Sequence, residues 1–486
     1  MTQQGLQSLE RAAGLGDIAA CAGGSLKDVD PLLADLVARE TRRQTEKITM
    51  VASESQPHPA VMEALASPFT SLYAEGYAPQ RLREAPLEEL ENVDARVQDY
   101  RGFGNRRYYK GAEFADLVES IAERRAAGAF ATDRCRAADI RANVQALSGS
   151  AANLAIYQAL LDPGDTMLAM ALAEGGHLTH GSPYSITGRQ YNAVFYQTDS
   201  HTEKLDYDAI RELAHEHRPR LLIGGFTSYP WAPDWAALGR IAREVGAYLL
   251  ADVSHLAGLI VAGVCANPFP HADVAMFTTH KTLCGPRGAV ILSRDAEIAR
   301  RIDRAVFPGL QGGPHVNKIA AIAVALQIAR SPAFARLQRR TVSNASALAS
   351  ALSAEGLRIA YNGTNTHLVL VDLAPLNLDG ETAARALDRA GIVCNRNVLP
   401  GDRSGRVVHG IRLGTTWVSQ WGWGTREMTR LAGIIARLLR TIAQDSPDHV
   451  LDSEPLVQHN SACSHARHEV ERLVMDAPGG AECTWA

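Results

Sequence analysis

Short apolar runs alternate with amphipathic helical stretches between about residues 144 and 292 of this 486-residue chain. The expected strands are Thr166–Met170, Val194–Tyr196, Leu221–Gly224, Tyr248–Asp252, Val274–Phe277 and Gly288–Leu292, and helices are expected at Asn153–Leu161, Asp208–His217 and Trp235–Val245. Strands that alternate with helices in this way predict an α/β fold built on a mostly parallel sheet.

The pattern changes near residue 321, where a long Ala-rich helix begins. Shorter elements follow at Arg358–Ala360, His367–Asp372, Thr382–Ala390 and Gly410–Gly414, which is typical of a smaller α+β domain. We predict an N-terminal arm (1–29), a large domain (30–320), a small C-terminal domain (321–443) and a poorly ordered tail (444–486) with one candidate helix around Arg467–Met475. The large domain should open with a helix at Asp30-Pro31.

Composition narrows the possible roles of the chain. Its apolar content of 46% and charged content of 21% are ordinary for a soluble globular protein. A net charge of -4 gives no electrostatic reason to expect a nucleic-acid or membrane partner. The seven cysteines lie far apart and no signal peptide is evident, which favours reduced thiols in a cytoplasm. The tail residues His459, Cys463, His465, His468 and Cys483 match no usual zinc spacing, so no metal is expected.

The strongest chemical signal is a lysine and an aspartate on neighbouring predicted strands. Asp252 ends one strand, and Lys281 follows the next one within Thr278–Thr282. In parallel sheets, ligands bind beyond the carboxyl ends of the strands, where both residues fall. A lysine amine that can form a Schiff base and a carboxylate that can keep a pyridine nitrogen protonated suit pyridoxal 5'-phosphate (PLP).

Other short motifs could serve the same cofactor, although each has an ordinary alternative. Ser148-Gly149-Ser150 before a helix is usually a plain cap, but it can also cradle a phosphate. His177 lies in a Gly-rich loop, where it is either solvated or stacked on a cofactor ring. Phe307–Pro314 is either a connecting turn or a backbone anion site. Arg412, between two glycines, is either a surface cation or a carboxylate ligand.

Ten segments in this order resemble the serine hydroxymethyltransferase family, from about Leu32 to Ala443. The segments are Val51–Glu54, Tyr73–Tyr77, Arg107–Tyr109, Leu147–Ser150, Gly175–Ser182, Asp252–Gly258, Thr278–Thr282, Gly285–Gly288, Phe307–Pro314 and Gly410–Gly414. The resemblance implies a fold-type I PLP-dependent transferase, similar to aspartate aminotransferase in its large domain. It also implies a homodimer or a dimer of dimers with shared sites.

The resemblance also implies residue roles. Lys281 would carry PLP covalently, and Asp252 would pair with its pyridine nitrogen. The other cofactor-binding residues would be His177, His255, His280, Ser148, Gly149 and Ser150, with Gly312 and Gly313 from a partner subunit. The substrate carboxylate would be held by Arg412 and Ser53. Glu75 would handle a proton near the hydroxymethyl group, and Tyr73 and Tyr108 would complete the site. The folate site would be lined by Leu172, Leu178 and Asn397.

The implied reaction interconverts serine and tetrahydrofolate with glycine and 5,10-methylenetetrahydrofolate. The alternative is a related threonine aldolase or transaldolase that acts on β-hydroxy amino acids without folate. A non-catalytic scaffold would be expected to lack Lys281, Asp252 or Arg412, and all three are present.

The chain departs from the family pattern in three places. Residues 78–106 form an insert, in which Pro86 is expected to open a helix with Leu87, Leu90, Val93, Val97 and Tyr100 on one face. This helix is expected to cap the active-site mouth or a dimer interface. His409 and the Trp417, Trp421 and Trp423 segment add bulk that could alter substrate choice. Met276 and Phe277 replace threonines, which predicts a packing change behind the cofactor.

Overall fold

The computed structural model describes residues 24–103, 107–402, 407–445 and 460–477. The chain forms two compact units, residues 1–48 and 49–486. The described part of the first unit contains α3 (Leu26–Val29), α4 (Pro31–Glu46) and the first residue of β1 (Ile48–Thr49). The Asp30 side chain accepts a hydrogen bond from Leu33 N at 2.9 Å, and Pro31 occupies the first helical turn of α4. The predicted helix start at Asp30-Pro31 is therefore confirmed.

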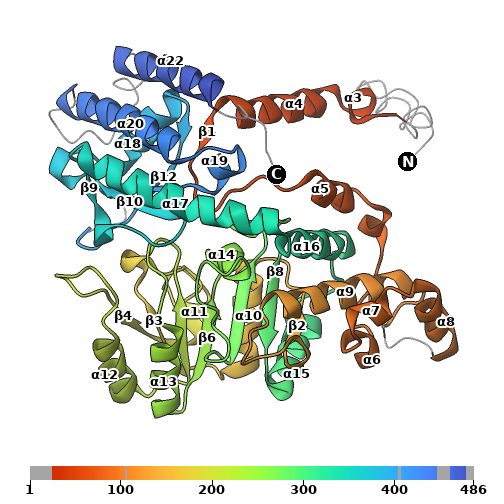
Figure 1. Ribbon diagram of the computed structural model, residues 1–486. Helices are drawn as coiled ribbons and strands as arrows, with labels where there is room; N and C mark the ends of the chain where they lie inside the picture. The colour runs from red at the N-terminus through yellow and green to blue at the C-terminus, as the bar shows by residue number, and fades with distance from the viewer. Residues whose placement is uncertain (1–23, 104–106, 403–406, 446–459, 478–486) are drawn as a thin grey trace, which may run out of the picture. The chain divides into compact units, whose positions relative to one another are not determined.

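Seven strands of the second unit form one sheet in the order β2-β8-β7-β6-β5-β3-β4 (Figure 1). Strands β4, β3, β5, β6 and β7 pair in parallel, whereas β8 is antiparallel to both β7 and β2. The bounds are β2 (Arg141–Asn143), β3 (Thr166–Met170), β4 (Asn192–Tyr196), β5 (Leu221–Gly225), β6 (Tyr248–Asp252), β7 (Val274–Thr278) and β8 (Ala289–Ser293). The predicted α/β class with a mostly parallel sheet is confirmed.

Both faces of this sheet are covered by helices. Neighbouring strand residues belong to different apolar clusters, as Leu249 and Leu250 of β6 do. Because neither face meets water, the strands have continuous apolar runs instead of alternating ones. The cluster on one face includes side chains of α9 (Glu113–Ala129), α13 (Trp235–Val245), α14 (Ala257–Val261) and α16 (Val316–Ala329). The other cluster includes side chains of α10 (Gly149–Leu160) and α15 (Ala296–Arg304).

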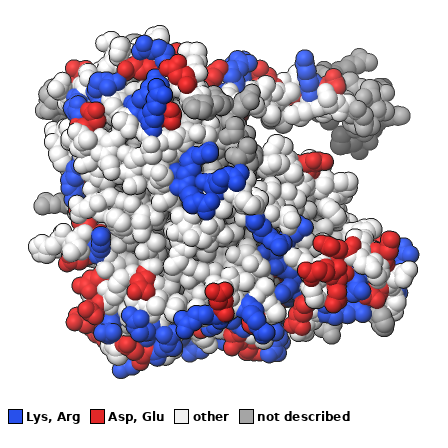
Figure 2. Space-filling model, viewed as in Figure 1, with Lys and Arg blue, Asp and Glu red and all other residues white. Residues whose placement is uncertain are grey.

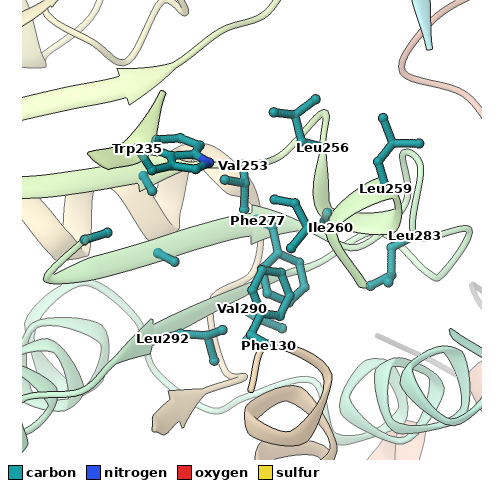
Figure 3. Close-up of a cluster of buried hydrophobic side chains, with 14 of the residues drawn as sticks. Phe130, Trp235, Val253, Leu256, Leu259, Ile260, Phe277, Leu283, Val290 and Leu292 are labelled. Atoms are coloured by element: carbon teal, nitrogen blue, oxygen red, sulfur yellow. The ribbon is translucent and has the colours of Figure 1, made fainter. Parts of the chain in front are cut away.

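Phe277 fills the first of these clusters at the centre of the sheet (Figure 3). Its ring is fully buried and stacks on Phe130, with centroids 4.8 Å apart and planes 14° apart. Met276, the preceding residue of β7, points to the opposite face and belongs to the second cluster. The two side chains therefore pack on opposite faces of β7, and a packing change relative to the family stays a prediction.

Shorter elements connect these layers and lead into them. The helices are α5 (Pro59–Leu65), α11 (Thr187–Gln190) and α12 (Tyr207–His217). The 3-10 turns are η1 (Pro68–Ser71), η2 (Ala137–Asp139) and η3 (Leu172–Glu174), and η4 (Ala305–Leu310) is a π-helical segment. Segment η4 leads into the glycines at 312 and 313.

A second, antiparallel sheet has the order β12-β13-β10-β9. Its strands are β9 (Arg358–Ile359), β10 (Leu368–Asp372), β12 (Asn395–Asn397) and β13 (Gly410–Gly414), and β11 (Ile392–Val393) lies between α18 and β12 in the chain. The accompanying helices and turns are α17 (Pro332–Ala354), η5 (Ala360–Asn362), η6 (Ala374–Leu376), α18 (Gly380–Arg389), α19 (Thr416–Gln420) and α20 (Thr425–Asp445). These elements lie in the region predicted as the small domain.

The described part of the predicted tail contains a helix, which includes the candidate range Arg467–Met475. Residues Ser461–Asp476 form α22, which packs against α20. The buried positions Cys463, Ala466, Val470 and Leu473 are spaced three or four residues apart, so they share one helical face. This apolar stripe is the physical reason for the order. Residues 446–459 and 478–486 lie outside the described residues, and so do residues 1–23 of the predicted arm.

The insert contains three short helices instead of the single predicted one. They are α6 (Gln80–Arg83), α7 (Leu87–Leu90) and α8 (Val93–Phe103). The Asn92 side chain accepts a hydrogen bond from Ala95 N at 3.2 Å, so Asn92 caps α8 and separates it from α7. Leu82 and Leu90 pack against Leu117 of α9. The insert is therefore anchored on its own chain through apolar contacts.

Candidate active site

Lys281 and Asp252 meet at the carboxyl edge of the large sheet, as the sequence predicts. Asp252 is the last residue of β6, and Lys281 follows the parallel neighbouring strand β7. Both residues line one cavity of about 200 Å³. Burial lowers the pKa of Lys281 to about 8, although the nearby Asp252 carboxylate favours the charged amine.

Asp252 is held as an anion by three donors. Burial alone would raise its pKa, but the hydrogen bond and charge of His180 outweigh burial and lower the pKa below its usual range. His180 Nε2 and Asn153 Nδ2 each lie 3.1 Å from Oδ2, and Ser254 N donates to Oδ1 at 3.1 Å. Sequence reasoning did not assign Asn153 or His180 to the site. Asn153 could have been found from its place in the first turns of the helix after Ser148.

The Ser148–Ser150 turn begins helix α10 at the same cavity. Ser148 caps the helix by accepting a hydrogen bond from Ala151 N at 3.3 Å. A Cβ atom at Gly149 would lie only 2.7 Å from Thr278 Cγ2, so the close approach of the turn to β7 requires glycine. All three residues of the turn line the cavity. The free N–H groups of a helix N-terminus and two hydroxyls favour an anion here.

Three histidines surround the cavity and are kept neutral. Burial lowers the pKa of His177 to about 4 and that of His280 to about 4. Burial also lowers the pKa of His255 well below its usual range, together with the charges of Lys281 and Arg412. The ring of His177 is fixed by the Thr179 hydroxyl, 2.7 Å from its Nδ1. Neutral rings can stack or donate without adding charge beside Lys281.

Arg412 reaches this edge from the smaller sheet. Its Nη1 donates to the Thr227 carbonyl oxygen, which follows β5, at 2.7 Å, and its Nε donates to Asn395 Oδ1 at 3.1 Å. Burial lowers the pKa of Arg412 to about 10, so it remains a cation near neutrality. Thr227 and Asn395 are further residues that sequence reasoning missed. Asn395 faces Arg412 across β12 and β13, a register that sequence alone does not reveal.

Ser53 lies close to the end of the strand that carries Arg412. Gly414 N donates to Met50 O at 2.7 Å, and a Cβ at Gly414 would meet Ala52 Cα at 2.3 Å. The chain segment before Ser53 therefore packs directly on β13. This backbone contact brings the segment before Ser53 beside the end of the strand that carries Arg412, more than three hundred positions later in the sequence.

A second group of predicted residues lies together but outside the cavity. The group is Tyr73, Glu75, Tyr108, Gly312 and Gly313. A Cβ at Gly312 would lie 3.3 Å from Glu75 Oε1, and one at Gly313 would lie 3.6 Å from the Tyr73 ring. Tyr73 and Tyr108 are 58% and 76% exposed. Among the described residues, the lining of the cavity includes none of the five.

The residues predicted to line a folate site also lie outside the cavity lining. Leu172 and Leu178 are exposed on either side of the Gly175–Gly176 turn. Asn397 ends β12, and its Nδ2 donates to Val398 O at 2.6 Å.

The tryptophans expected to alter the substrate side are instead part of the interior. Trp421 and Trp423 are fully buried and form an edge-to-face pair with centroids 5.5 Å apart. Trp417 is 4% exposed. His409 Nδ1 contacts Asp402 Oδ1 at 2.7 Å, and it does not line the cavity in the described chain.

In the described ranges no group of three or more His, Cys, Asp or Glu side chains could hold a metal ion. No single described helix is long and apolar enough to cross a membrane. Among the described helices, the bent pair α16 and α17 has the length and apolar composition of a membrane span only when the two are taken together. In Figure 2, basic and acidic side chains are mixed along the upper and lower edges of the face, whereas its middle is mostly uncharged apart from a small basic patch.

The residues around the cavity fit PLP. They provide a carboxylate that stays charged, a partly buried amine beside it and a helix N-terminus that favours phosphate. Four buried polar atoms of described lining residues have no hydrogen-bond partner in the protein: Thr278 Oγ1, His280 Nδ1, Asn153 Oδ1 and His180 Nδ1.

Fold and site together define a fold-type I PLP-dependent enzyme. A sequence model described as serine hydroxymethyltransferase matches residues 26–100 and 89–435, and these two stretches overlap within the insert. The serine hydroxymethyltransferase of Acidothermus cellulolyticus is 45% identical over 421 residues, which cover 86% of this chain and 91% of that protein. The chain belongs to the serine hydroxymethyltransferase family and is a PLP-dependent transferase.

Proposed function

We propose that this enzyme transfers the hydroxymethyl carbon of serine to tetrahydrofolate, giving glycine and 5,10-methylenetetrahydrofolate, at the Lys281 cavity. The observation that carries the proposal is that Lys281, Asp252 and the Ser148–Ser150 turn line one cavity at the carboxyl edge of the sheet. PLP, bound covalently to Lys281, supplies an electron-withdrawing ring that stabilises negative charge on the substrate Cα.

Lys281 and Asp252 have complementary tasks. The lowered pKa of Lys281 leaves an appreciable fraction of its amine uncharged near neutrality, as a nucleophile requires. The lowered pKa of Asp252 keeps a negative charge where it can hold a proton on the pyridine nitrogen. His180 and Asn153 keep that carboxylate in one orientation.

The substrate is oriented from the smaller sheet. The Arg412 guanidinium presents a planar fork that can bind the serine carboxylate in a bidentate manner, and Ser53 adds a hydroxyl nearby. The two hydrogen bonds that Arg412 donates, to Thr227 O and Asn395 Oδ1, fix the plane of the guanidinium. Fixing the carboxylate also fixes which bond to Cα stands perpendicular to the cofactor ring.

The second group, around Glu75, serves the cavity of another copy of the chain in this proposal. Glu75, Tyr73, Tyr108, Gly312 and Gly313 are partly exposed and lie beyond their own cavity, which is the arrangement expected of residues that complete a partner's site. There Glu75 would hold or move the proton of the serine hydroxyl oxygen. The protein would then be a homodimer or a dimer of dimers.

Mixing two inactive variants tests this arrangement. Lys281→Ala and Glu75→Gln chains, unfolded together and refolded, form mixed dimers in which one site has both native residues. We expect recovery of about a quarter of wild-type activity, because half of randomly formed dimers are mixed and each has one intact site. No recovery, with mixed dimers demonstrated by mass spectrometry, would show that each site uses residues of one chain.

The folate acceptor needs its own experiment. Leu172, Leu178 and Asn397 are assigned to the folate site by family resemblance. The visible absorbance of the purified holoenzyme with glycine should change strongly on addition of tetrahydrofolate, and Leu178→Asp should reduce that response. A spectrum indifferent to folate would favour the threonine aldolase or transaldolase alternative, which threonine and aldehyde substrates would then test.

A further inference from the structure

Three successive carbonyl groups around Glu75 are held by two neighbouring residues. Arg107 Nη1 donates to Ala74 O at 2.7 Å and to Gly76 O at 2.9 Å. Tyr108 N donates to Glu75 O at 3.2 Å. The backbone on both sides of Glu75 is therefore fixed by residues that follow the insert.

Arg107 is itself immobilised. Its side chain is fully buried, Nε donates to Asp116 Oδ1 at 2.6 Å, and Nη2 donates to Glu119 Oε2 at 2.9 Å. Burial alone would lower its pKa, but the charges of Glu119 and Asp116 outweigh burial and raise the pKa above its usual range. The guanidinium is thus a permanent cation joining helix α9 to the Glu75 loop.

Gln145 closes the same network from the sheet side. Its Nε2 donates to Gly76 O and to Glu119 Oε2, each at 2.9 Å. The Gly76 carbonyl oxygen therefore accepts from both Arg107 and Gln145. Two oxygens of this network, Glu119 Oε1 and Gln145 Oε1, are buried without a hydrogen-bond partner, so the donors converge on the Gly76 carbonyl oxygen and on Glu119 Oε2.

The insert separates two parts of this network along the chain, the segment 74–76 before it and Arg107 after it. In the sequence, residues 78–106 follow the Glu75 loop and end just before Arg107. Tyr77, the last residue before the insert, donates its hydroxyl to Asp303 O at 2.7 Å. Both ends of the insert are therefore tied down on the core of the large unit.

We propose that Arg107 is a positioning residue for Glu75, and that its clamp on residues 74–76 keeps the carboxylate in place despite the insert. The inference rests on the proposed role of Glu75 in serine cleavage. Arg107 touches neither substrate nor cofactor in this assignment and acts only through the loop.

Arg107→Lys is the direct test. Lysine keeps the positive charge between Asp116 and Glu119, but its single nitrogen cannot replace Nε, Nη1 and Nη2, which together bond to both carboxylates and to the carbonyl oxygens of Ala74 and Gly76. We expect kcat for serine cleavage to fall roughly 10-fold or more, because small displacements of a reacting group cost this much. The KM for serine, the visible absorbance of the holoenzyme and the exchange of the glycine α-proton should stay unchanged, since none of them needs Glu75.

A double-mutant cycle separates this inference from the role of Glu75 itself. If Arg107 acts through Glu75, Arg107→Lys should have no further effect on kcat in a Glu75→Gln background. An undiminished effect in that background would overturn the positioning role, whatever Glu75 does. A Glu75→Gln variant with normal serine kinetics would instead refute the proposed function of Glu75.

Arg83 supplies a matched control. This arginine also bonds to two carboxylates, Glu123 and Asp303, and to the Ala142 carbonyl oxygen, but it lies in the insert. Arg83→Lys should lower thermal stability and leave kcat unchanged. An equal loss of kcat in Arg83→Lys would show that loss of any buried arginine impairs the enzyme.

A milder substitution tests the same network if the Arg107→Lys variant does not fold. Gln145→Met removes one donor from Gly76 O and leaves Arg107 in place. It should lower kcat in the same selective way by a smaller factor. Unaltered kcat in a folded Gln145→Met enzyme would contradict the proposed clamp.

Discussion

His367 Nε2 lies 3.1 Å from His255 Nδ1 and also 3.1 Å from the Ala52 carbonyl oxygen. A carbonyl oxygen can only accept, so the bond to Ala52 O requires a proton on His367 Nε2. His255 Nδ1 faces that N–H and must therefore be an acceptor, which puts the His255 proton on Nε2. This relationship joins the cofactor cavity, the smaller sheet and the segment before Ser53.

Replacing His367 by phenylalanine should destabilise the fold. The ring stack with His255, now at a centroid distance of 5.3 Å, can be kept, but Ala52 O and His255 Nδ1 lose their donor. Unmet buried acceptors cost about 1–3 kcal/mol of unfolding free energy each. Urea titration measures the loss, and His367→Asn, which can still donate from its amide, should recover part of it. Equal stability of the phenylalanine variant and the wild type would contradict the assigned proton.

Acid should destabilise the fold through the same residue. Burial lowers the pKa of His367 to about 3 in the folded state, whereas an unfolded histidine titrates near 6.5. Between those values the unfolded state binds more protons, so stability falls as pH drops below about 6.5. Between pH 6.5 and 5 this amounts to about 2 kcal/mol for one such group. Urea titrations at both pH values should show a smaller difference for His367→Asn than for the wild type.

Lys281→Ala should abolish turnover, because the nucleophile that would bind PLP is lost. Borohydride reduction should attach the cofactor to wild-type Lys281, identified by peptide mass spectrometry, and leave the variant unlabelled. Lys318→Ala, an exchange outside the cavity lining, serves as the matched control and should remain active. Full activity of the Lys281→Ala variant would contradict the assignment of the cofactor site.

Gly149→Ala should weaken cofactor binding more than it alters the rest of the fold. The new methyl group would stand 2.7 Å from Thr278 Cγ2, and relief of this overlap would displace the Ser148–Ser150 turn or β7. Overpacking of this kind costs about 1–3 kcal/mol. Gly128→Ala, on α9 with open space around its Cβ position, should be harmless. Equilibrium dialysis of PLP with both variants measures the difference, and equal affinity would contradict the close approach.

Local pattern was enough to predict the large sheet and its chemistry. The bounds Thr166–Met170, Tyr248–Asp252 and Gly410–Gly414 agree with the structure residue for residue. Continuous apolar runs can be recognised from sequence because a parallel sheet is buried on both faces. The placement of Lys281 and Asp252 at one edge follows from chain direction alone, once the strands are parallel.

The local sequence pattern did not predict structure correctly where helix capping or contacts between distant residues determine it. The helix predicted from Pro86 to Tyr100 is broken because the Asn92 side chain caps a new helix, an interaction that competes with the apolar periodicity. The helix in the tail, α22, is longer than the candidate at Arg467–Met475, because its apolar stripe begins at Cys463 and the helix packs against α20. The bulky Trp421 and Trp423 could have faced a substrate or a core, and only packing decided for the core.

The fold class, the strand positions and the residue types suited to PLP could be predicted from the chain alone, because they depend on periodicity and on side-chain chemistry. The meeting of distant residues follows only from the folded chain: Asn153 and His180 on Asp252, His367 on His255, and Arg107 on the carbonyl oxygens of Ala74 and Gly76. These contacts depend on strand order, register and loop path, which are set by packing of the whole chain and not by any local run of residues.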